Sequence, residues 1–194
     1  MSRALYLAGL GYVAICGIVL LNRRQTAPAV ARGGDEPVTP AAPVYGAAGQ
    51  WFAETKPFCN ALEVDVRQQQ VPPPSGVEGA GYSAACYALA GKIDLARQTI
   101  ERLSDRERSV AAGIVFEIGH PVADAGDDRS AGPIMRLVVE YQLDNYMALY
   151  HAGASEYMLG ESDYARTHLQ RFLELYQPDD GWRRNALNML EHLQ

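Results

Sequence analysis

The chain has 194 residues, 48% of them hydrophobic, and a formal net charge of −6. Residues 49–194 hold 13 Lys and Arg against 21 Asp and Glu, a net charge of −8. A domain this acidic lacks the basic surface that binds nucleic acid, so the charge excludes nucleic acid as an expected partner.

The first element predicted along the chain is an apolar helix. Residues 4–21 contain no charged side chain, and a helix of that length reaches ~27 Å, about the thickness of a bilayer core. A cleaved signal peptide is the alternative, but its apolar core is shorter and ends in small residues, whereas this run ends in Leu-Leu-Asn-Arg-Arg. We therefore expect residues 1–24 to be an uncleaved, single-pass membrane anchor.

The orientation of this anchor stays open. Arg23, Arg24 and Arg32 follow the span, which by the positive-inside rule slightly favours a cytoplasmic domain. Arg3 and the terminal amine precede the span and oppose that orientation.

A linker is expected after the anchor. Residues 25–49 are rich in Pro, Ala and Gly, a composition that cannot bury a core and acts as an extended tether. We expect the folded domain at residues 50–194. Ala, Leu, Glu, Arg and Gln dominate there and long alternation of Val, Ile and Thr is missing, which predicts an all-α fold. Its first element is expected to be an amphipathic helix over residues 51–70.

Three similar segments then recur at a nearly fixed spacing. GKIDLARQTI, GDDRSAGPIM and GESDYARTHL begin at Gly91, Gly126 and Gly160, which are 35 and 34 residues apart. A period of this length is typical of stacked helix pairs. Gly91 and Gly160 are each expected at the turn that ends a helix, because a residue without a Cβ fits there.

The helices of the first pair are predicted on either side of Gly91, at residues 78–90 and 93–103. Ser104 and Glu107 then form a capping-box pattern, in which each side chain can bond the backbone of the other residue. A new helix is therefore expected to begin at Ser104.

The middle pair contains two prolines. Pro121 disfavours helix at His120, so we expect the first helix to end there and a long loop to follow. Ser130 is the expected N-cap of the next helix, which would place Pro133 in its first turn, where a missing N–H has no cost.

The last pair is predicted at Asn145–Gly160 and from Ser162, its expected N-cap, to Pro178. Asp179 or Asp180 is expected to cap a final helix.

This pattern resembles tetratricopeptide repeats. The small residues at which helices of that family approach closely correspond to Ala84, Ala96, Gly119, Ala131, Gly153 and Ala165, and the large second-helix residues to Ile100, Met135 and Leu169. The family's Trp is replaced by Ala80, Val115 and Leu149, and only Pro178, one place late, corresponds to its closing Pro. The resemblance implies a short solenoid of about three degenerate repeats with flanking helices.

The resemblance also implies a concave groove, lined by the first helix of each pair, that binds a protein or peptide. The positions expected to line it are Phe116, His120, Asp124, Met147, Tyr150 and Tyr157. Aromatic and Met side chains provide adaptable contact area, although the tyrosines have the alternative of packing inside the fold. The chain lacks the Lys, Asn and Arg set with which chaperone-binding relatives hold a terminal carboxylate. A partner with basic residues would suit the acidic domain.

An alternative function is that of a hydrolase or a metal-binding protein whose site lies in the loop His120–Asp128. Its spacing matches neither an EF-hand nor HExxH, and no nucleophile motif accompanies it. We therefore expect no enzyme activity, cofactor or metal, and a solvated loop in which Asp127 or Asp128 makes turn bonds. His151 and His168 are expected on solvated helix faces.

The cysteines leave two interpretations. Cys16 lies in the apolar run, and only Cys59 and Cys86 lie in the domain. A Cys59–Cys86 disulfide requires an oxidising compartment. Two buried free thiols are the interpretation that the sequence favours.

Overall fold

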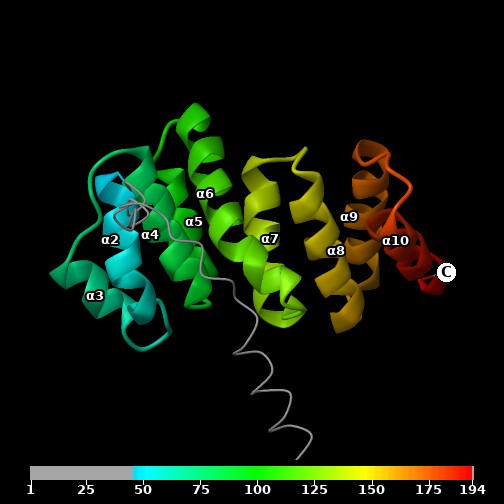
Figure 1. The fold of residues 1–194 in the computed structure, drawn as a ribbon, viewed down its shortest axis with the longest axis horizontal. Coiled ribbons are helices and arrows are strands. Elements are labelled where there is room, and N and C mark those ends of the chain that lie inside the picture. Colours follow the sequence, from blue (N-terminus) through cyan, green and yellow to red (C-terminus); the bar gives the residue numbers. More distant parts are fainter. Residues whose placement is uncertain (1–45, 194) are drawn as a thin grey trace, which may run out of the picture. The chain divides into compact units, whose positions relative to one another are not determined.

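A computed structural model describes residues 46–193, and these residues confirm the all-α class (Figure 1). The helices are α2 (Ala47–Thr55), the short 3-10 helix η1 (Lys56–Phe58), α3 (Val64–Gln70), α4 (Val77–Leu89), α5 (Ile93–Glu101), α6 (Asp105–Asp124), α7 (Asp128–Tyr141), α8 (Tyr146–Leu159), α9 (Ser162–Leu175) and α10 (Gly181–His192). Residues 46–193 contain no strand, and none of their helices has the length and apolar character needed to cross a bilayer. The predicted anchor lies outside the described residues.

The single helix predicted over residues 51–70 is wrong, because the chain turns at η1. Pro57 lies in that turn, and Cys59 follows it with a disulfide to Cys86, the two Cα atoms being 4.8 Å apart. The Trp51 indole N–H donates to the carbonyl of Val71 at 2.9 Å and so ties α2 to the end of α3. Because Cys59 and Cys86 are bonded to each other, the interpretation of two buried free thiols is also wrong.

The three glycines of the period each follow a helix and have positive φ. This confirms the predicted turns at Gly91 and Gly160, whereas Gly126 is predicted within a long loop and instead lies in the short turn after α6. Their φ angles are 73° at Gly91, 81° at Gly126 and 77° at Gly160. The left-handed conformation costs glycine little, and it reverses the chain between α4 and α5, between α6 and α7, and between α8 and α9.

Successive helix pairs do not contact each other through the same helices (Figure 1). The first and second pairs meet through one combination of helices, and the second and third pairs through another. α4 packs against α6, whereas α7 packs against α8, and α10 packs on α8 and α9. Small residues allow close approach inside the pairs: a Cβ at Gly119 would lie 2.6 Å from Ile134 Cγ2. The pairs are therefore tightly packed, but their stacking is not a repetition of one step.

Pro121 does not end its helix, which corrects the predicted early stop at His120. α6 continues through the proline to Asp124. Gly119 and Ala123 are buried on the two sides of the proline, so tertiary packing outweighs the local preference of Pro121. The predicted long loop is reduced to residues 125–127, while the capping box of Ser104 and Glu107 is confirmed.

Two predicted N-caps are displaced. Asp127, not Ser130, caps α7, because its Oδ1 accepts a hydrogen bond from the backbone N–H of Ser130 at 3.1 Å. Pro133 consequently lies in the interior of α7 instead of its first turn. Glu161 is the N-cap of α9, and Ser162 is the first helical residue.

Other helix ends are confirmed. Asn145 caps α8 by accepting from the N–H of Ala148 at 3.0 Å. Asp180 caps α10 by accepting from the N–H groups of Trp182 and Arg183. Both caps satisfy backbone donors that have no partner inside the helix.

Candidate functional site between α6 and α8

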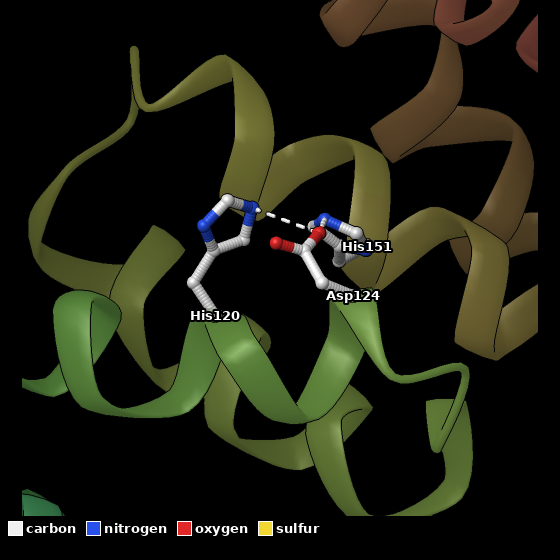
Figure 2. A group of neighbouring side chains, drawn as sticks. All are labelled: His120, Asp124 and His151. Atoms are coloured by element: carbon white, nitrogen blue, oxygen red, sulfur yellow. Dashed lines mark ion pairs between the residues drawn. The ribbon is translucent and has the colours of Figure 1, made fainter. Parts of the chain in front are cut away.

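Three side chains with metal-ligating atoms meet between α6 and α8: His120, Asp124 and His151 (Figure 2). Asp124 Oδ1 lies 3.5 Å from Nε2 of His120 and 3.7 Å from Nε2 of His151. One ligating atom from each residue lies within 4.8 Å of the other two. We call these residues the His–Asp–His cluster.

The continuation of α6 through Pro121 builds one half of this cluster. His120 and Asp124 are four residues apart on a continuous helix, so their side chains lie on one face. A loop at this position, as the sequence predicts, would not hold them in that relation. α8 supplies His151 from the opposite side.

The ring nitrogens of both histidines face Asp124 without a hydrogen bond. Nε2 of His120 and Nε2 of His151 are buried and have no hydrogen-bond partner. Their distances to the carboxylate exceed the range of ordinary N–H···O bonds. Buried polar atoms are almost always paired, so two unpaired nitrogens aimed at one carboxylate call for an explanation.

His151 is the most enclosed member of the cluster. Its side chain is 4% exposed, compared with 26% for His120 and 49% for Asp124. Burial, reinforced by the charge of His120 and opposed by that of Asp124, lowers the pKa of His151 to about 4. His151 is therefore neutral near pH 7, with a lone pair on one ring nitrogen.

Aromatic rings hold both imidazoles in place. The ring of Phe116 stacks on His120 with centroids 4.7 Å apart. Tyr150 and Trp182 meet His151 edge-on, at 5.2 Å and 5.6 Å. The two histidines are thus positioned by packing and not by hydrogen bonds of their Nε2 atoms.

The structure distributes the predicted groove residues over three places. His120 and Asp124 join the cluster, and Phe116 and Met147 line a neighbouring hollow. Tyr157 is partly buried and lines a second hollow near the end of α8.

Tyr150 is buried, 7% exposed, beneath Phe172 and Trp182. It therefore contributes to the packing between α8 and α10. Only part of its surface lines the second hollow.

Sequence reasoning missed His151, and the expectation that His151 and His168 are solvated is wrong. His168 is mostly buried and bonds the carboxylate of Glu156 through Nδ1 at 2.7 Å. A signal for His151 was available, since it lies four residues after Met147 on the same face of α8 as the predicted groove residues. The sequence does not show how close His151 lies to α6, and that distance is what forms the cluster.

The cluster brings together two imidazole nitrogens and a carboxylate oxygen, a set that can ligate a cation or exchange a proton. No protein-family model, no curated protein and no solved structure matches this chain.

Proposed function

We propose that this protein is a membrane-tethered interaction module whose tetratricopeptide-like helix pairs bind a protein or peptide along a groove on α8, bordered by α6 where α8 begins and by α10 where α8 ends. The observation that carries the proposal is a pair of hollows along one stripe of α8, each lined by large apolar side chains. The His–Asp–His cluster lies between them.

The first hollow has a volume of about 500 Å³ and lies where α8 begins. It is lined by Ser109, Phe116, Gln142, Leu143, Asp144, Asn145, Tyr146 and Met147. Leu143 and Tyr146 are exposed, at 69% and 43%. Exposed Leu and Tyr beside a hollow are the kind of surface that a partner side chain fills.

The second hollow has a volume of about 320 Å³ and lies where α8 ends. It is lined by Asp128, Tyr150, Ala154, Tyr157, Met158, Asn185, Asn188, Met189 and His192. Met158 is 70% exposed, and two Met side chains give this hollow an adaptable lining. On α8, Met147, Ala154 and Met158 follow a helical stripe, so one extended segment can reach both hollows.

The charge of the groove favours a partner with basic residues. Glu117 and Asp124 are exposed on α6, and Asp144 is exposed beside the first hollow. A segment of apolar residues with a few Lys or Arg would match both the hollows and these carboxylates.

The helix pairs support a tetratricopeptide-like solenoid. Left-handed glycines occur at the three periodic turns, and small residues allow close approach where the family has them. The stacking differs between successive pairs, so the proposed solenoid is degenerate.

We propose that residues 1–24 anchor the domain on an oxidising side of the membrane. The Cys59–Cys86 disulfide supports this side, because disulfides persist in oxidising compartments. The arginines after the span favour the other side by a small margin. Alkaline carbonate should leave the full-length chain in the membrane, and an impermeant protease added to sealed cells should digest the domain. Protection of the domain until the cells are lysed would contradict its exposure at the cell surface.

Selection of a displayed random-peptide library on the full-length chain in detergent tests the groove. Apolar peptides with Lys or Arg should be enriched. Phe116→Ala and Tyr157→Ala should weaken the best peptide roughly thirtyfold if they anchor it.

Tyr164→Ala is the matched control, because Tyr164 is a 64% exposed tyrosine on α9 that lines neither hollow. Equal affinity for the Tyr157, Phe116 and Tyr164 variants, all folded, would rule out the groove.

A further inference from the structure

We infer that His120, Asp124 and His151 form a binding site for a divalent transition-metal ion, with Zn²⁺ as the ion that fits best. This inference is independent of the proposed partner groove. It rests on the convergence of three ligating atoms and on a buried, unpartnered imidazole that points to the same place.

The distances leave room for an ion. Two ligand atoms that each bind Zn²⁺ at about 2.0–2.1 Å in tetrahedral geometry lie roughly 3.3 Å from one another. Asp124 Oδ1 lies 3.5 Å and 3.7 Å from the two Nε2 atoms. Closing these two distances takes a few tenths of an ångström. The ligating atoms of the two histidines lie within 4.8 Å of each other, so the imidazoles would approach by up to ~1.5 Å through side-chain rotation on binding.

The chemistry of the atoms selects among ions. Two imidazole nitrogens and one carboxylate oxygen are ligands that Zn²⁺ uses in three-residue sites. Ca²⁺ and Mg²⁺ prefer oxygen atoms only, so they fit this set poorly. The described residues bring no thiolate to the cluster, since Cys59 and Cys86 are joined to each other.

An ion also explains the unpaired nitrogens. A buried nitrogen without a partner destabilises the fold, and His151 is 4% exposed with its Nε2 unpaired. Coordination would satisfy this atom and Nε2 of His120 together. Since aromatic rings already fix both imidazoles, little ordering of side chains would remain to be done on binding.

One coordination position is left for another ligand. The exposure of the three side chains rises from His151 through His120 to Asp124, so the cluster is accessible from the Asp124 side. Three protein ligands and an accessible fourth position describe a site that binds a water molecule or a donor atom from a partner.

The test uses the full-length chain, purified in detergent with a chelator and then freed of it. Zn²⁺ alone is titrated against a competing indicator, and Co²⁺ is added to a second sample for its visible spectrum. We expect one Zn²⁺ per chain, the intense visible bands of four-coordinate Co²⁺, and a higher melting temperature with Zn²⁺.

Each ligand is replaced in turn, by Asp124→Asn, His120→Gln and His151→Gln. Loss of a residue that only supports a ligand weakens metal binding roughly 10–100-fold, so loss of a direct ligand should weaken Zn²⁺ binding by more than that. His192→Gln and Asp163→Asn are matched controls, because both residues are exposed and lie outside the cluster. Asp124→Asn keeps the test valid if the buried His151 variant fails to fold. Less than one tightly bound Zn²⁺ in the parent, or equal binding by the folded Asp124 and Asp163 variants, would overturn the site.

Discussion

Gly153 of α8 packs directly against Leu169 of α9. A Cβ placed on Gly153 would lie 2.7 Å from Cγ of Leu169 and 3.2 Å from its backbone nitrogen. Leu169 itself is fully buried. The absence of a side chain at one position thus creates the space that the other occupies.

Gly153→Ala should destabilise the domain by roughly 1–3 kcal/mol through overpacking. Leu169→Ala should cost roughly 2–5 kcal/mol through the cavity it leaves. In the double variant the shorter side chain makes room for the new methyl group, so the two costs should not add. Chemical denaturation of the four proteins measures the coupling. Strict additivity would show that the two residues do not share this contact.

The Cys59–Cys86 disulfide should stabilise the domain by ~3–4 kcal/mol, because it closes a loop with a sequence separation of 27 in the unfolded chain. Replacing both cysteines by Ser should lower the melting temperature by the same amount as a reductant lowers that of the parent. Cys16→Ser is the control and should behave like the parent. Mass spectrometry of unreduced peptides checks the pairing directly, and free thiols at both positions in oxidised protein would refute it.

Glu156 and His168 form a buried polar pair, in which the hydrogen bond to His168 stabilises the buried carboxylate of Glu156. The Glu156 side chain is 1% exposed, and the nearest guanidinium nitrogen, from Arg136, is 3.9 Å away. His168→Ala should therefore cost roughly 1–3 kcal/mol, because it removes the hydrogen bond to a buried carboxylate.

Adding Glu156→Gln to His168→Ala should recover part of that loss, since a neutral amide is cheaper to bury than a charge. His192→Ala, on the exposed side of α10, is the control and should change little. If Glu156→Gln further destabilises the His168→Ala protein, the carboxylate does not depend on His168.

Asp180 should make stability depend on acid pH. The hydrogen bond from the Tyr176 hydroxyl, together with the N–H groups of Arg183 and Trp182, lowers the pKa of its carboxyl below the ordinary value of 3.8. A lowered pKa contributes stability above pH 3.8 that is lost as the pH falls through the folded pKa. The difference in melting temperature between the parent and Asp180→Asn should shrink from pH 6 to pH 2. Asp179→Asn, which leaves the cap intact, should show a smaller change, and identical curves for both variants would contradict the assignment.

Local features of the sequence were enough to predict several helix ends. Gly91 and Gly160, the box of Ser104 and Glu107, and the cap at Asp180 act on the backbone within a few residues, so their effect is visible without the fold. The all-α class follows from composition and periodicity in the same way.

Tertiary packing decided what lies between those ends. Burial of Gly119 and Ala123 carries α6 through Pro121 and keeps Asp124 on the face of His120. The approach of α8 then brings His151 to within 3.7 Å of Asp124, across 27 residues of chain. Such distances between helices are set by the shapes of all the side chains packed between them, and no local pattern contains that information. The sequence alone therefore determined the all-α class and several helix ends, whereas only the fold decided that two histidines and one aspartate meet.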